Sequence, residues 1–323
     1  ESDKPNMGSL FSTCGAGVEP SDDNIAFVFI KPQALTPQVK ELVEKRLNSD
    51  GMMVVQSGSL DASVIDEKKL IDQHYYAIAS KATLLKPSEL NVPAEKFKDK
   101  FGVEWEEVLA RSEAYNASDA CTKLGCGPEE LGDHWQKAQD SGNLVKLGGG
   151  FYCGKLEVGS ETLYVFNAFF MRMRNKFTAA GASIHYFVVR WETSKLPWAD
   201  FRGKVLGPTD PVQAPADSLR GTIYARWEEL GLKSQPNTSD NCVHASASPF
   251  EGLAERMNWL GTEVEQDTYG MYLLKAGLTK ETIAKWSVDP TVEWAGNKSS
   301  LFDALEDMDA VAMKDKALDI ARG

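Results

Sequence analysis

Apolar and polar positions alternate along this chain in blocks that predict strands and helices in turn. Ile25 to Ile30 and Ser183 to Trp191 are apolar runs of strand type, and Met52 to Leu60 predicts a further strand. Thr36-Pro37 opens a stretch with apolar residues at helical spacing, and Asp50-Gly51 ends it. This alternation favours a domain that combines a sheet with helices.

The pattern continues after these strands. A short apolar segment that reaches His244 predicts a fourth strand. The helices expected beside the strands are Val64 to Ala79, the basic amphipathic stretch Phe169 to Phe177, Pro197 to Leu206, Leu219 to Leu230 and a run that ends at Trp259. Four strands interleaved with helices predict an α+β fold of the ferredoxin-like type, an antiparallel sheet in β-α-β-β-α-β order with helices packed on it.

Residues 83 to 168 interrupt this pattern. Proline and charged residues punctuate two predicted helices, at about 94–114 and 128–141. Residues 151–158 and 162–166 predict a hairpin. The modest apolar content favours a mainly helical insertion over an independent domain.

The chain therefore divides into three parts. Residues 1–24 form a polar N-terminal arm, and residues 25–260 form the main domain with its insertion at about 83–168. Residues 261–323 form a polar, acidic C-terminal extension with short helices expected near Lys280 and Asp303. The pattern leaves open whether the extension packs on the domain or offers a contact surface.

Composition narrows the classes of partner. The 323 residues are 42% hydrophobic, enough for a sizeable core, and the net charge of −12 argues against nucleic acid or an anionic membrane surface. A small nucleotide remains compatible, because it needs only a few local cations. The sequence contains no run of 18 apolar residues, so it predicts no membrane span. Five scattered cysteines favour free thiols in a reducing compartment, with the cytoplasm preferred and an organelle as the alternative.

The richest candidate chemistry lies around His244. This histidine ends an apolar segment, has small neighbours, and precedes a predicted helix that carries Glu255. A neutral imidazole can act as a nucleophile, and a carboxylate on one ring nitrogen fixes the tautomer and frees the other. The alternative is a half-buried histidine that caps the helix. Cys242, two residues earlier, is either a reactive thiol or a buried structural one.

Five segments, in chain order, resemble the motifs of nucleoside diphosphate kinases. They are Phe27-Val28-Phe29-Ile30-Lys31-Pro32, Gln73-His74-Tyr75, Phe201 to Pro211, Pro215 to Gly221, and Asn241-x-x-His244-x-Ser246-x-Ser248. The resemblance covers roughly residues 25–82 and 169–260. Each motif alone is weak, and their common order makes the resemblance specific.

The resemblance implies a ping-pong transfer of a γ-phosphoryl group from a nucleoside triphosphate to a diphosphate. His244 would be the nucleophile, Glu255 would orient its ring, and Ser246 would hydrogen-bond the leaving oxygen. The residues implied to bind the nucleotide are Lys31, Tyr75, Phe170, Thr209, Arg220 and Asn241, with Phe170 stacking on the base. Magnesium would arrive with the nucleotide phosphates and take no protein ligand. The family also implies a homo-oligomer or a larger assembly, including assemblies of the cilium.

Several positions depart from the family's pattern. Ala245 and Ala247 stand where the family carries glycine and aspartate. Gly203 falls at the position of a second phosphate-binding arginine, between Arg202 and Lys204, and no proline follows Phe170. Two other functions therefore stay open: a catalytically weak or inactive relative that acts as a structural or partner-binding module, and a site adapted to a different anionic metabolite.

Overall fold

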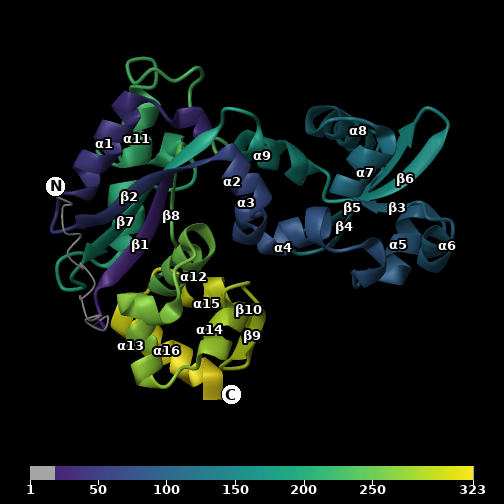
Figure 1. Cartoon of the computed structure of the whole chain (residues 1–323). Coiled ribbons are helices and arrows are strands. Elements are labelled where there is room, and N and C mark those ends of the chain that lie inside the picture. Colours follow the sequence, from purple (N-terminus) through teal and green to yellow (C-terminus); the bar gives the residue numbers. More distant parts are fainter. Residues whose placement is uncertain (1–18, 323) are drawn as a thin grey trace, which may run out of the picture.

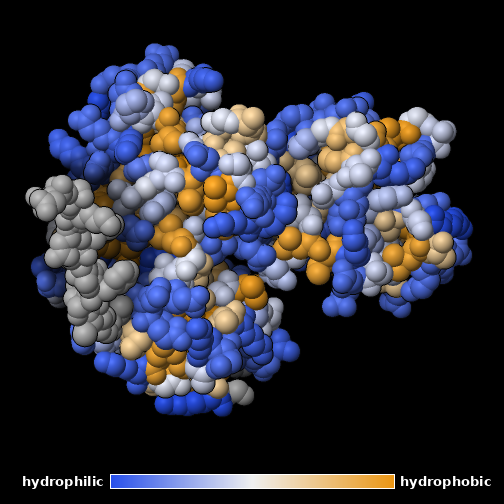
Figure 2. Space-filling model, viewed as in Figure 1, coloured by the Kyte–Doolittle hydropathy of each residue, from blue (hydrophilic) through white to orange (hydrophobic). Residues whose placement is uncertain are grey.

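The computed structural model describes residues 19–322 (Figure 1). The expected polar arm at 1–24 lies mostly outside this range, and so does Cys14. Hydrophilic residues cover most of the face seen in Figure 2, with apolar residues exposed in separate areas. Within the described range, no helix has both the length and the apolar character needed to cross a bilayer.

The main domain is built on a four-stranded sheet. Its strands are β1 (Asn24–Ile30), β2 (Met53–Asp61), β7 (Ser183–Trp191) and β8 (Val243–Ala245). They lie in the order β2-β7-β1-β8, and every neighbouring pair is antiparallel. The expectation of a mixed α+β fold is confirmed.

Helices pack on both faces of this sheet. On one face lie α1 (Pro37–Leu47) and α11 (Leu219–Ala225), and on the other lie α2 (Ala62–Glu67), α3 (Leu70–His74), α9 (Phe169–Thr178) and α12 (Pro249–Leu260). Strand β1 is buried at every residue because alternate side chains enter the two cores: Phe27 and Phe29 join one, and Val28 and Ile30 join the other.

Some expected helices are shorter or broken. The single helix predicted at Val64 to Ala79 is divided into α2, α3 and α4 (Tyr76–Ala79), because Lys69 adopts a left-handed conformation with φ 55° and Tyr75 leaves helical geometry. The segment at Pro197 to Leu206 consists of α10 (Trp198–Asp200) and the π-helical turn η4 (Phe201–Leu206). These breaks matter because Tyr75 and Arg202 lie in or beside them.

The insertion combines helices with a second sheet, of which the sequence predicted only the hairpin. It contains a second sheet in the order β3-β6-β5-β4, from β3 (Ala114–Asn116), β4 (Leu144–Gly148), β5 (Phe151–Val158) and β6 (Glu161–Phe166). Its helices are α5 (Ala94–Phe101), α6 (Trp105–Ala110), α7 (Ala117–Leu124) and α8 (Pro128–Asp140). The expected hairpin forms as β5 and β6. Figure 1 shows this unit beside the main sheet, joined to it through α4 and α9.

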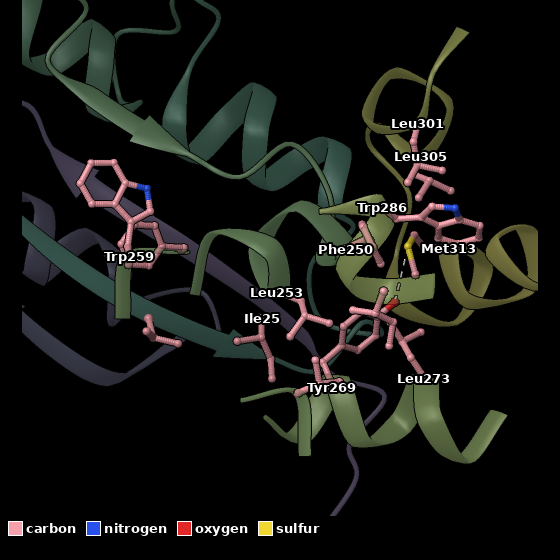
Figure 3. Close-up of a cluster of buried hydrophobic side chains, with 14 of the residues drawn as sticks. Ile25, Phe250, Leu253, Trp259, Tyr269, Leu273, Trp286, Leu301, Leu305 and Met313 are labelled. Atoms are coloured by element: carbon pink, nitrogen blue, oxygen red, sulfur yellow. Dashed lines mark hydrogen bonds between the residues drawn. The ribbon is translucent and has the colours of Figure 1, made fainter. Parts of the chain in front are cut away.

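The C-terminal extension packs on the main domain, which answers the question left open by its sequence. It contains α13 (Thr268–Ala276), α14 (Lys280–Trp286), β9 (Thr291–Trp294), β10 (Asn297–Ser300), α15 (Leu301–Leu305) and α16 (Ala310–Arg322). Tyr269, Trp286 and Met313 share a buried cluster with Ile25 of β1 and Phe250 of α12 (Figure 3). The apolar residues of this acidic segment are therefore core residues of the fold.

Candidate functional site

His244 and Glu255 form a hydrogen-bonded pair between β8 and α12. His244 stands opposite Phe29 in the sheet, and Glu255 projects from α12, whose first turn is capped by the Ser248 side chain. The imidazole Nε2 lies 2.5 Å from the Glu255 Oε1. The other ring nitrogen, Nδ1, has no hydrogen-bond partner within residues 19–322. The His244 side chain keeps 17% of its surface exposed, so this nitrogen belongs to a ring that solvent reaches.

The Ser246 hydroxyl donates a hydrogen bond to the second carboxylate oxygen of Glu255. The same hydroxyl accepts a hydrogen bond from the Phe27 backbone N–H at 2.9 Å and lies 2.5 Å from Glu255 Oε2. The residue is fully buried. The implied contact between Ser246 and a leaving oxygen therefore does not fit, because the hydroxyl faces β1 and Glu255. Ser246 is a positioning residue for the carboxylate.

His74 completes the arrangement, although its sequence context did not mark it as a site residue. Its Nδ1 lies 3.3 Å from Glu255 Oε1 and accepts a hydrogen bond from the Trp259 indole at 3.3 Å. Its ring stands edge-on to the His244 ring, with centroids 4.6 Å apart. The available signal was its place beside Tyr75 in the quoted Gln73-His74-Tyr75 motif.

Burial keeps both imidazoles neutral. Burial, followed by the charges of Lys31 and Arg220, lowers the pKa of His244 well below its usual value. Burial and the neighbouring His244 lower the pKa of His74 to about 3, and burial raises the pKa of Glu255 above its usual range. At neutral pH, His244 therefore has a lone pair available for attack.

Two predicted cations lie near this pair. Burial and then the Arg220 charge lower the pKa of Lys31 to about 8, so the amine is largely protonated at pH 7. Arg220 is buried and donates to the Val243 carbonyl at 2.8 and 3.2 Å and to the Gly207 carbonyl at 2.9 Å. It contributes positive charge to the site, while much of its guanidinium is already hydrogen-bonded to backbone carbonyl oxygens.

Arg202 is a third cation, and its partners come from the C-terminal extension. Its charge also lowers the pKa of His244, after those of Lys31 and Arg220. Its guanidinium Nη1 lies 2.6 Å from Glu306 Oε1 and 2.8 Å from Asp307 Oδ1. The two acidic residues lie between α15 and α16, more than one hundred positions away in the sequence.

Asn241, Thr209 and Tyr75 lie at the edges of the site. The Asn241 amide donates to the Thr209 carbonyl at 3.2 Å, and its buried Oδ1 has no hydrogen-bond partner within residues 19–322. Burial raises the pKa of Tyr75 to about 12, so its phenol stays protonated. Tyr75, with both histidines and Glu255, lines a cavity of about 200 Å³. The extension closes part of its wall.

Phe170 does not fit its implied role. Its side chain is fully buried in the core of the insertion, so neither face of the ring is available to stack on a base. The neighbouring Phe169 is only partly buried and faces Trp135 and Tyr152 instead. Phe170 therefore cannot stack on a nucleotide base, because its ring is packed in the hydrophobic core of the insertion.

Cys242 is a structural thiol. It is buried, adopts a positive φ of 68°, and its pKa is raised to about 12, chiefly by burial. Burial and the raised pKa favour the structural alternative over the reactive one. Its strained conformation lies immediately before the strand that carries His244.

The donor atoms of His74, His244 and Glu255 lie within 4.8 Å of one another, close enough to test as metal ligands. Tetrahedral ligands at about 2.1 Å from an ion would stand about 3.4 Å apart, whereas His244 and Glu255 are in contact at 2.5 Å. The positive charges of Lys31, Arg220 and Arg202 also oppose a cation here. The cluster fits a hydrogen-bonded pair better than a metal centre.

Comparisons with known proteins give little beyond this geometry. No protein-family model matches the chain, and no curated protein matches it. Among solved structures, an apo nucleoside diphosphate kinase from Encephalitozoon cuniculi is similar at 13% identity and a TM-score of 0.36, over 74% of this chain and 90% of that one. An NDP kinase from Pyrobaculum aerophilum is similar at 17% identity and a TM-score of 0.34, over 73% and 95%. At these low values, the similarities assign neither a family nor an activity to this chain.

Proposed function

We propose that this chain is a nucleoside diphosphate kinase-like phosphotransferase that uses His244 as its nucleophile. The observation that carries the proposal is the 2.5 Å contact between Glu255 and His244 Nε2, which orients the ring and leaves Nδ1 without a partner among the described residues 19–322. Lys31 supplies a positive charge beside the ring. A nucleoside triphosphate is the substrate class that combines an electrophilic terminal phosphorus with a negative charge suited to these cations.

The transfer takes two balanced steps. The Nδ1 lone pair of His244 attacks the γ-phosphorus, the bond from phosphorus to the β-phosphate oxygen breaks, and the nucleoside diphosphate leaves with that electron pair. A terminal oxygen of a second diphosphate then attacks the phosphohistidine, and the P–N bond returns its electrons to Nδ1. Glu255 accepts the Nε2–H bond and stabilises the positive charge that develops on the ring. Magnesium, bound to the nucleotide phosphates, would offset part of their charge.

Two further features support this reading. The Oδ1 of Asn241 is a buried acceptor beside Thr209 that has no partner in the part of the chain that the structure describes, and a ribose hydroxyl could supply one. We also propose that the main domain has the ferredoxin-like arrangement. The sheet order β2-β7-β1-β8, with α1 after the first strand and α11 before the last, supports it.

Phosphate labelling tests the proposal directly. Purified protein incubated with γ-labelled ATP and magnesium should gain acid-labile, base-stable phosphate, and GDP should discharge it as GTP. His244→Ala should abolish labelling. His134→Ala, in α8 of the insertion, is the matched control and should label normally. Equal labelling of His244→Ala, or no labelling of wild type, would overturn the proposal.

A second function, a weak relative that serves as a structural or partner-binding module, is favoured by one observation. The extension places two carboxylates on Arg202 and contributes Ser287 and Phe302 to the cavity wall. This function predicts nucleotide binding without turnover, and a normal rate of phosphate exchange between ATP and GDP would contradict it.

A further inference from the structure

A second pocket lies in the insertion, and it shares no residue with the His244 site. Its volume is about 520 Å³, and its lining comes from α8, β4, β5 and the first residue of α9. The lining residues are Trp135, Gln139, Leu144, Lys146, Tyr152 and Phe169. A cavity of this size holds a small organic molecule.

Three aromatic rings form its apolar wall. Phe169 stands perpendicular to Tyr152, at 89° with centroids 5.7 Å apart, and lies 5.9 Å from the Trp135 ring. Rings set at such angles present both faces and edges to a planar molecule that lies against them. The wall therefore favours a flat aromatic ligand over a flexible aliphatic one.

Gly154 allows this wall to form. A Cβ at this position would approach Leu144 Cδ2 at 2.6 Å and Trp135 Cζ3 at 2.8 Å. The absence of a side chain at Gly154 lets the Trp135 indole approach β5 this closely. The indole is held by the strand beneath it, so the wall of the pocket is preformed.

The mouth of the pocket carries one positive charge. Lys146 Nζ lies 5.9 Å from the centre of the Tyr152 ring, and Lys146 forms no ion pair within residues 19–322. Gln139 adds an exposed amide that can donate and accept hydrogen bonds. In a chain of net charge −12, a cation without a carboxylate partner beside an aromatic pocket favours an anionic ligand.

We propose that this pocket binds a small aromatic molecule that carries one anionic group. The ligand ring lies against the wall formed by Trp135, Tyr152 and Phe169, and the anion pairs with Lys146 at the mouth. The site is independent of the phosphotransfer proposed for His244, so either proposal can fail alone.

The test uses three probes that separate the ring from the charge: indole-3-acetate, the neutral indole-3-ethanol, and acetate. Dissociation constants are measured on the full chain by calorimetry and by saturation-transfer NMR. Indole-3-acetate should bind, indole-3-ethanol should bind about two- to fivefold more weakly, as expected for one solvent-exposed ion pair, and acetate should not bind. AMP serves as a fourth probe for an anion carried on a nucleoside.

Variants assign the binding to this pocket. Lys146→Gln should bind indole-3-acetate and indole-3-ethanol with equal dissociation constants. The matched control Lys155→Gln, on the adjacent strand but paired with Glu157, should leave it unchanged. Leu144→Trp should fill the pocket and weaken both aromatic probes at least tenfold, and Trp135→Leu should do the same if it folds. Equal binding of acid and alcohol to wild type, or unchanged binding to Leu144→Trp, would overturn the proposal.

Discussion

The contact of Arg202 with the C-terminal extension gives the sharpest prediction about the proposed phosphate site. Replacing Glu306 and Asp307 by the isosteric Gln and Asn removes two negative charges that compete with a nucleotide phosphate for the same guanidinium. Asn tolerates the left-handed conformation of Asp307, whose φ is 60°, and the backbone bond from its N–H to the Ala247 carbonyl can persist. The double variant should therefore bind ATP more tightly without losing its fold.

The magnitude follows from the exposure of the three groups. The side chain of Arg202 is 27% exposed, and those of Glu306 and Asp307 are 45% and 48% exposed, so each pair is a partly solvated ion pair. Such pairs contribute about 0.2–1 kcal/mol each. Two of them amount to about 0.4–2 kcal/mol, which corresponds to about a two- to thirtyfold decrease in the ATP concentration needed for half-maximal labelling.

The assay is the rate of His244 labelling as a function of ATP concentration. The control is a double variant of Glu263 and Glu265 to Gln, which removes the same charge from the same extension but from contacts with Lys280. This control should change the half-saturating concentration little. If the variant of Glu306 and Asp307 behaves like the control, or if Arg202→Gln labels as wild type does, Arg202 takes no part in phosphate binding.

Three further outcomes are expected. Labelling should fall as pH rises through about 8, because Lys31, with a pKa lowered to about 8, loses its charge there; Lys31→Arg should remove this fall in the pH–rate profile. Gly252→Ala should lower the unfolding free energy by about 1–3 kcal/mol, measured by urea denaturation, since its Cβ would lie 2.6 Å from the Ile25 carbonyl oxygen and would push α12 from β1. His74 is neutral when folded, with a pKa of about 3, but titrates near 6.5 when unfolded, so its contribution to stability is present above pH 6.5 and is lost as pH falls. Below pH 6.5, the unfolding free energy of wild type should fall relative to that of His74→Gln, by up to about 1.4 kcal/mol per pH unit. A difference between the two proteins that stays constant from pH 5 to pH 7 would contradict this assignment.

The sequence predicted the elements whose signals are local. Strand β7 matches its expected range at both ends, because nine residues of mostly apolar, β-branched and aromatic character leave little ambiguity. Helix α12 begins at the Ser248 cap and ends one residue past the expected Trp259. By contrast, β3 has three residues and β4 has five, too few for a period to show.

The site shows the same division. The pairing of His244 with Glu255 could be anticipated because only residues 246–248 separate the strand that carries His244 from the helix that carries Glu255. The burial of Phe170 could not, because the choice between it and Phe169 depends on which face of α9 meets the insertion. The contact of Arg202 with Glu306 also has no local signal, since the two residues are 104 positions apart in the sequence.

The distribution of charge connects the two functions that the structure leaves in competition. A chain of net charge −12 offers a triphosphate no general attraction, so affinity depends on the cations beside His244. The Lys31 amine forms no ion pair within residues 19–322, but Arg220 uses much of its donor fork on backbone carbonyls. Arg202 is then the remaining group able to grip a phosphate with two parallel donors, and its partners are the solvent-exposed carboxylates of the extension. If a nucleotide phosphate displaces those carboxylates from Arg202, the guanidinium supplies the positive charge that phosphoryl transfer requires. If the carboxylates stay on Arg202, the site lacks that charge and the structural or partner-binding function fits better, so the partner of Arg202 decides between the two proposed functions.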